Sequence, residues 1–318
     1  MKLQTIIPLQ KAENPIAYSS KLLLLGSCFV ENMGEKLHYY QFQQLQNPFG
    51  ILFQPLALEN LVRRALNHEL YREHEVFEQN GIWHCFDAHS GIRSESKHGL
   101  LQRLNAVLVE TRHWLESSSH IILTLGTAWV YGHKATNAPV ANCHKVPQKE
   151  FSKKLLPIDA ITASLESLVK MVTEVNSEVQ FIFTISPVRH LKDGFVENQQ
   201  SKSHLITSVH ALLSSRAHSR DLSYFPAYEI MMDELRDYRF YGNDLVHPSA
   251  LAVDYFWEKF ASVWISEDCQ AIMEEVDTIQ KGLLHRSFNP DSEAHQKFET
   301  SLRSKITYLQ ERYPFMKF

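Results

Sequence analysis

Residues 21–37 read KLLLLGSCFVENMGEKL. The apolar run at the start ends at Gly26, which predicts a short buried strand. Val30, Met33 and Leu37 then recur at three- and four-residue steps, which predicts a helix with one apolar face. A strand that turns directly into a helix is typical of the first half of a βαβ unit.

Two more apolar runs resemble the first one, at residues 120–125 and 179–185, and each ends in small or turn-forming residues. Helical patterns lie between them, over residues 55–70 and 158–175. Strands that alternate with helices predict a mostly parallel sheet. Because ligands bind beyond the carboxyl ends of such strands, we expect the three strand ends to face one site.

Composition excludes several classes of protein. The 318 residues are 44% hydrophobic and 21% charged, with a formal net charge of -4, which favours an ordinary globular chain and excludes a global positive field for nucleic acid or anionic membranes. The four cysteines form no CxxC pair, which argues against a disulfide scaffold. The start of the chain lacks the apolar region of a signal peptide, and no run is long enough to span a bilayer. We therefore expect a cytoplasmic protein with reduced thiols.

The chain is expected to form one main domain, residues 1–262, with a helical extension over residues 263–318 packed on it. Residues 71–99 are polar and rich in His and Glu, and they predict an insertion with a hairpin near Gly81. Helical patterns at residues 272–284 and 298–309 are broken by Asn289-Pro290.

Ser27 lies between the first strand and its helix. The start of a helix offers free N–H groups and positive potential, where an oxyanion would be stabilised. A nucleophilic serine fits this place, but the Gly-Ser pair taken alone is more typical of a serine that only caps the helix. Cys28 is the alternative nucleophile; we favour Ser27, since a buried thiol is the commoner state of cysteine.

A second motif, Asp244-Leu245-Val246-His247-Pro248, stands before a predicted helix. Pro248 suits the first helical position and holds His247 extended at the junction. Asp244 can turn back to accept the Nδ1 proton of His247, which leaves Nε2 free as a base. A plain surface turn before a capped helix is the alternative.

Gly26-Ser27-Cys28-Phe29 together with the Asp244 to Pro248 motif resembles the GSCFA family, a branch of the SGNH (GDSL-like) hydrolases. Further matching segments extend the resemblance over about residues 22–260. They are Asn47-Pro48-Phe49-Gly50, Leu125-Gly126-Thr127-Ala128-Trp129, Asn142-Cys143-His144-Lys145, Ser186-Pro187-Val188-Arg189-His190 and Arg236-Asp237-Tyr238-Arg239-Phe240-Tyr241.

The resemblance implies a flavodoxin-like three-layer α/β/α sandwich of the SGNH hydrolase type, with a mostly parallel sheet and a helical C-terminal appendage. It also implies ester hydrolysis by Ser27, with His247 as base and Asp244 orienting it. Relatives in the superfamily complete the oxyanion hole with a glycine N–H and an asparagine. Ala128 stands in the asparagine's place and has no side-chain donor. The oxyanion hole is therefore expected to use the Ser27 N–H with Gly50, Asn47 or Thr127.

His144, Arg189 and His190 are candidates for binding substrate, since cations in loops after strands can hold an anionic group. Pairing with acidic residues inside the protein is the alternative. Residues 84–89 contain metal-ligand types, but their spacing fits no standard zinc pattern, so no metal and no cofactor are expected.

The sequence thus favours a metal-independent serine esterase that cleaves an ester, with acetyl among the candidate acyl groups, of a small metabolite or glycan. An acyltransferase that uses the same acyl-enzyme is one alternative. A binding module on a retired hydrolase fold is the other, motivated by Ala128. No nucleic-acid or membrane partner is expected, and the sequence leaves the oligomeric state open.

Overall fold

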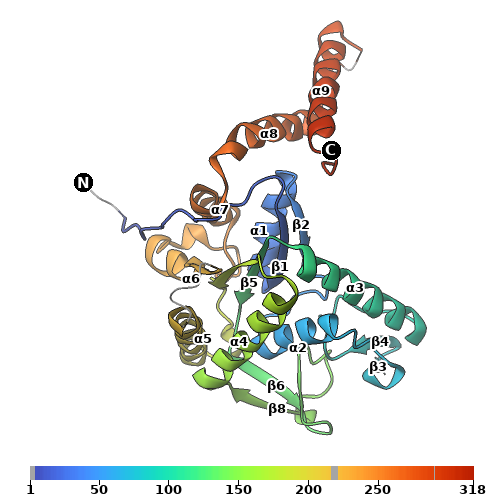
Figure 1. Ribbon diagram of the computed structural model, residues 1–318, viewed down its shortest axis with the longest axis vertical. Coiled ribbons are helices and arrows are strands. Elements are labelled where there is room, and N and C mark those ends of the chain that lie inside the picture. Colours follow the sequence, from blue (N-terminus) through green and yellow to red (C-terminus); the bar gives the residue numbers. More distant parts are fainter. Residues whose placement is uncertain (1–3, 216–220, 290) are drawn as a thin grey trace.

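The computed structural model describes residues 4–215, 221–289 and 291–318 (Figure 1). Its central sheet has five parallel strands in the order β10-β9-β5-β1-β2. Their bounds are β1 Lys21–Gly26, β2 Gln43–Gln46, β5 His120–Leu125, β9 Gln180–Ile185 and β10 Leu222–Phe225.

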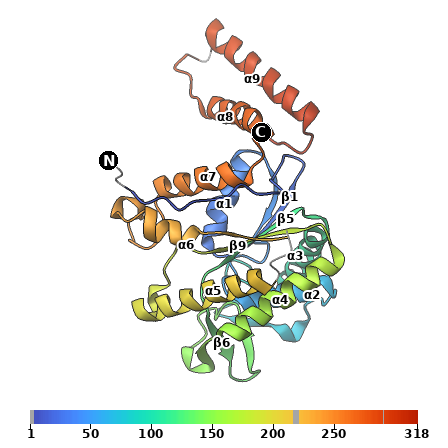
Figure 2. The same ribbon diagram turned by 60° about the vertical axis from the view of Figure 1, so that its left-hand side comes forward.

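Helices cover both faces of this sheet. Successive side chains of β1 point to opposite faces, so both faces are apolar and each forms a core with the helices packed on it. Leu23 and Leu25 belong to the core under α2, α3, α4 and α5, whereas Leu22 and Leu24 belong to the core under α1 and α7. Figure 2 shows the sheet between these two layers. The helices are α1 Cys28–Tyr39, α2 Pro55–Leu66, α3 Lys97–Ser117, α4 Ile158–Val175, α5 Phe195–Ser215 and α7 Ala250–Trp264. The predicted three-layer α/β/α fold is confirmed.

One predicted helix is shorter than its pattern. The helix expected over residues 55–70 is α2, which ends at Leu66. Its cap is Asn67, and His68 takes a φ of +55°, a left-handed conformation that ends the helix. By contrast, α4 covers the full range 158–175 that the periodicity predicts.

Two small antiparallel sheets lie outside the central one. The polar stretch 71–99 holds a hairpin of β3 (Val76–Gln79) and β4 (Ile82–Cys85), which turns at Gly81 as the sequence predicts. A second small sheet, which the sequence did not predict, consists of β6 (Trp129–His133), β7 (Ala138–Val140) and β8 (Phe151–Leu155). Its strands are short and partly exposed, so their apolar pattern is weak.

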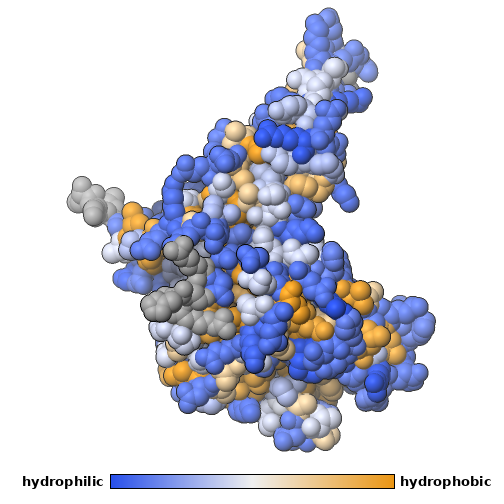
Figure 3. All heavy atoms as spheres, in the orientation of Figure 1, coloured by the Kyte–Doolittle hydropathy of each residue, from blue (hydrophilic) through white to orange (hydrophobic). Residues whose placement is uncertain are grey.

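The C-terminal region is helical. After a very short α6 (Ala227–Glu229) and α7, the helices α8 (Gln270–Leu284) and α9 (Glu293–Arg312) extend away from the sheet (Figure 1). Val276 and Ile279 of α8 join the core beneath α1, but only Leu309 of α9 is buried. Figure 3 shows that this projecting part is covered largely by hydrophilic residues. Within the described residues, no helix has the length and apolar character to cross a membrane.

Candidate active site

Ser27 occupies the turn between β1 and α1, at the carboxyl edge of the sheet. Gly26 has a φ of +139°, and a Cβ on it would lie 2.2 Å from the Thr124 carbonyl oxygen, so only glycine fits. The Ser27 Oγ caps α1 by accepting a hydrogen bond from the Phe29 N–H at 3.3 Å, and the residue is 1% exposed. Capping uses a lone pair of the hydroxyl and leaves its proton for a base.

Asp244 and His247 are brought together by a tight turn. Asp244 Oδ1 accepts hydrogen bonds from the Val246 and His247 N–H groups at 3.0 Å each, and Oδ2 lies 2.6 Å from His247 Nδ1. The backbone N–H groups of His247 and Val246 hold the pKa of Asp244 well below its usual value. Leu245 takes a φ of +58° to close the turn. The carboxylate therefore stays ionised and fixes the imidazole with Nε2 outward.

The segment after β9 supports the loop that carries His247. An Arg189 Nη2 donates to the Leu245 carbonyl at 3.4 Å. Burial is the main cause that lowers the pKa of His190 to about 4, with smaller contributions from Lys202 and His247. Among the described residues, however, no hydrogen bond joins Ser27 to His247, and both side chains of the Asp244–His247 pair are about half exposed.

Most of the expected oxyanion donors already have partners. The Ser27 N–H donates to a carbonyl of β5 at 3.0 Å, and the Gly50 N–H donates to the Asn47 carbonyl at 2.7 Å. The Thr127 hydroxyl lies 3.0 Å from the Ser201 hydroxyl and accepts from the Trp129 N–H at 3.1 Å. These hydrogen bonds take up the backbone N–H of Gly50 and hold the Thr127 hydroxyl, so both rank behind Asn47.

Asn47 is the donor that the structure leaves free. Its Oδ1 accepts a hydrogen bond from the Gly26 N–H at 2.9 Å, which ties the residue to the turn before Ser27. Its Nδ2 is buried and has no partner among the described residues. The amide is therefore held by its oxygen at the turn before Ser27, with both of its N–H bonds unused.

A cavity of about 350 Å³ is lined by Thr127, His144 and His190, whereas Ser27, Asn47 and His247 are not among its lining residues. His144 Nε2 lies 2.7 Å from the Cys85 carbonyl, and burial is the main cause that lowers the His144 pKa to about 4. The imidazole is therefore neutral near pH 7 and serves as a donor to the carbonyl, not as a cation for an anionic substrate. His190 is neutral for the same reason, whereas Arg189 holds the His247 loop.

Sequence reasoning missed Lys202 of α5. Its side chain is fully buried, and Nζ donates to the carbonyls of Gly126 and Ser186 at 2.8 Å each. It thus joins the ends of β5 and β9, and burial lowers its pKa to about 7. The signal was its helical register, since Leu205 and Val209 follow at three and seven residues on the buried face.

The structure also bears on the rival chemistries. Burial raises the pKa of the Cys28 thiol, which disfavours the thiolate that a cysteine nucleophile requires. Across the described part of the chain, no group of three or more His, Cys, Asp or Glu residues is arranged to hold a metal ion.

Comparison with known families matches two successive parts of the chain, which do not overlap. A model of the GSCFA family matches residues 21–260, which includes Ser27, Asn47 and the Asp244–His247 pair. A model described as the C-terminal domain of GSCFA domain proteins matches residues 276–318, which holds most of α8 and all of α9. No curated protein matches the chain. The match over three quarters of the sequence shows that the chain belongs to the GSCFA family.

Proposed function

We propose that the protein is a serine acyl hydrolase of the SGNH (GDSL-like) type that cleaves an ester of a small metabolite or glycan. The observation that carries the proposal is the Asp244–His247 pair, with its Nδ1 contact of 2.6 Å and its outward Nε2. In a reaction cycle of this kind, Asp244 holds the imidazole tautomer and stabilises the imidazolium that forms.

The chemistry takes place in two steps. His247 Nε2 removes the Ser27 proton as Oγ attacks the ester carbonyl, and the tetrahedral oxyanion collapses to an acyl-serine while His247 returns the proton to the leaving alcohol. Water, activated by the same histidine, then attacks the acyl-serine and releases the carboxylic acid and free Ser27. An acceptor alcohol in place of water would give an acyltransferase through the same intermediate.

Two features of the Ser27 turn support this assignment. The N-terminus of α1 lies at the Ser27 turn, and its positive potential favours an oxyanion there. Asn47, whose Oδ1 accepts from the Gly26 N–H before Ser27, has a free Nδ2 donor, and we assign to it the donor role that the side chain of Ala128 cannot fill. Since Ser27 and His247 form no hydrogen bond here, the reaction requires a closer approach of Nε2, as is common in substrate-free enzymes.

A binding module without catalysis is the second candidate. It is favoured by one observation, namely that the Ser27 and Gly50 N–H groups both donate within the protein. The Asn47 amide and the Asp244–His247 pair argue for the hydrolase, since a pure binding fold has no use for an oriented imidazole.

Ester turnover with matched variants tests the proposal. We expect wild type to hydrolyse 4-nitrophenyl acetate, Ser27→Ala and His247→Ala to lose this activity, and Cys28→Ala to keep it. Circular dichroism checks that each variant is folded. Loss in Cys28→Ala with retention in Ser27→Ala would reverse the nucleophile, and no turnover by wild type on a panel of acetyl and longer-chain esters would favour the binding module.

A further inference from the structure

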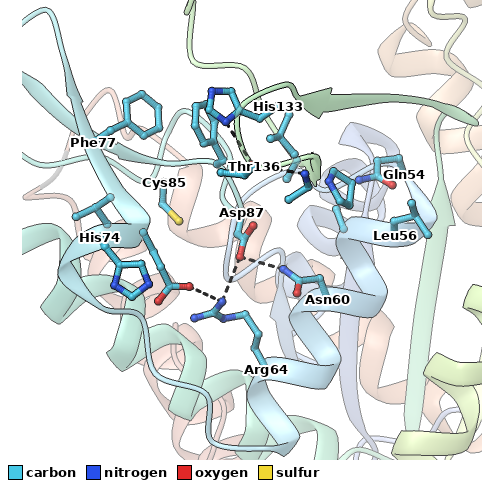
Figure 4. Close-up of a pocket in the computed structure, with 18 residues that line it drawn as sticks. Gln54, Leu56, Asn60, Arg64, His74, Phe77, Cys85, Asp87, His133 and Thr136 are labelled. Atoms are coloured by element: carbon cyan, nitrogen blue, oxygen red, sulfur yellow. Dashed lines mark hydrogen bonds and ion pairs between the residues drawn. The ribbon is translucent and has the colours of Figure 1, made fainter. Parts of the chain in front are cut away.

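A second and larger cavity, of about 560 Å³, plays no part in the proposed chemistry. It lies between α2, the β3–β4 hairpin and the loop that joins β6 to β7 (Figure 4). Its volume is in the range of small-molecule sites. Three residues, Gln54, Val140 and Ala141, line both this cavity and the smaller one beside Thr127 and His190. The larger cavity therefore adjoins the smaller one.

Gln54 stands between the two cavities with an unused carboxamide. It is 3% exposed, and neither Oε1 nor Nε2 has a hydrogen-bond partner among the described residues. It precedes α2, but its side chain does not cap that helix. A buried carboxamide costs free energy unless both ends are hydrogen-bonded, so this one is an unsatisfied donor and acceptor in the wall that the two cavities share.

The charged residues of the larger cavity do not favour an anion. Arg64 Nη1 lies 2.7 Å from Glu75 and 3.7 Å from Asp87, so two carboxylates already surround the one guanidinium. Asn60 donates to Asp87 at 2.9 Å (Figure 4). The carboxylate oxygens of this cluster are acceptors, which suit the hydroxyl groups of a neutral ligand.

The remaining wall is apolar. Phe77 and Phe86 stack with ring centroids 4.2 Å apart, and Leu56 and Val140 lie on the same lining. A ligand that fits must pair a neighbouring donor and acceptor with a body of C–H groups. A sugar ring has both features, since vicinal hydroxyls match a carboxamide and its C–H face packs on aromatic rings.

We propose that the larger cavity binds a neutral sugar unit of the substrate, with Gln54 as the residue that hydrogen-bonds its hydroxyls, so that the ester on that sugar reaches Ser27. The inference rests on the proposed hydrolase function for the last clause only. Sugar binding by the cavity is independent of any turnover.

The binding test uses Ser27→Ala protein, which cannot turn over an ester. Cellobiose, xylobiose, maltose and chitobiose are titrated by isothermal calorimetry, with hexanol as an apolar probe. We expect one of the disaccharides to bind, and the further change Gln54→Leu to weaken it by about 10-fold or more through the loss of two hydrogen bonds. Gln44→Leu is the matched control, because Gln44 of β2 also has an unpartnered oxygen but lines neither cavity. Binding of hexanol alone, or of none of these probes, would overturn the inference.

A kinetic comparison separates this inference from the proposed function. In Gln54→Leu, the ratio of kcat/KM for the acetylated form of the bound disaccharide to kcat/KM for 4-nitrophenyl acetate is expected to fall about 10-fold, through a higher KM for the sugar ester. Equal effects on both esters would contradict a sugar subsite. Sugar binding without any ester turnover would support the sugar subsite and refute the hydrolase. Turnover of 4-nitrophenyl acetate without sugar binding would support the hydrolase and refute the sugar subsite.

Discussion

Replacing Asn47 separates its structural role from its proposed catalytic one. In Asn47→Ala the buried Gly26 N–H loses the Oδ1 acceptor at 2.9 Å, which costs about 1–3 kcal/mol. The φ of +40° at this position disfavours alanine by about 1–2 kcal/mol more. Asn47→Asp keeps an oxygen for Gly26 and tolerates the left-handed backbone, so its loss of stability comes from the burial of a carboxyl group and not from the backbone or the Gly26 N–H.

Both variants remove the free Nδ2 donor. If it stabilises the oxyanion, kcat for 4-nitrophenyl acetate falls by about 10²- to 10³-fold in each, equivalent to about 2.7–4 kcal/mol of transition-state stabilisation, with little change in KM. Urea unfolding measures stability, and initial rates measure kcat on the folded fraction. The reasoning is refuted if Asn47→Asp is folded and keeps kcat within about threefold of wild type.

Three further changes test the surroundings of the site. Gly26→Ala is expected to lose about 3 kcal/mol or more of unfolding free energy, because its Cβ would lie 2.2 Å from the Thr124 carbonyl oxygen. Gly81→Ala has open space around the added Cβ and should lose only about 1–2 kcal/mol, so equal losses of the two variants in urea unfolding would contradict this prediction. The pKa of Lys202 is about 7 in the folded state and 10.5 in the unfolded state, so the unfolded state binds more protons between these pH values. The stability of wild type relative to Lys202→Met should therefore rise from pH 7 to pH 10, and a stability difference that does not change with pH would contradict a buried lysine. For His144, with a pKa of about 4 against 6.5 when unfolded, stability should fall as pH drops from 6.5 to 4, and His144→Gln should reduce that slope in thermal melts at stepped pH.

The sequence predicts the three inner strands of the central sheet, β1, β5 and β9, because they are buried on both faces, and the helical segments because they have clear apolar stripes. β5, for example, is buried at every position, and α4 matches its predicted range. The outer strands β2 and β10 are only partly buried, so their apolar pattern is weaker. The sheet of β6, β7 and β8 was missed since exposed antiparallel strands depend on their neighbours for pairing, which a local pattern does not record.

Part of the candidate site could likewise be predicted from local sequence, and part could not. The contact between Asp244 and His247 follows from local spacing, because His247 lies three residues after Asp244 and the left-handed conformation of Leu245 closes the turn between them. Gln54 and Lys202 have no local signature of function. Their importance comes from what surrounds them, a cavity wall in one case and two strand ends in the other. Likewise, the choice of Asn47 over Gly50 depends on which N–H group already has an acceptor, and only the folded chain decides that.

Covalent labelling tests the central claim most directly. Wild-type protein is treated with a fluorophosphonate at neutral pH, and the adduct is located by proteolysis and mass spectrometry. The account predicts one adduct per chain, on Ser27, absent from Ser27→Ala, retained in Cys28→Ala and greatly slowed in His247→Ala. An adduct on any other residue, or no adduct on folded wild-type protein that is active on esters, would contradict a Ser27 nucleophile.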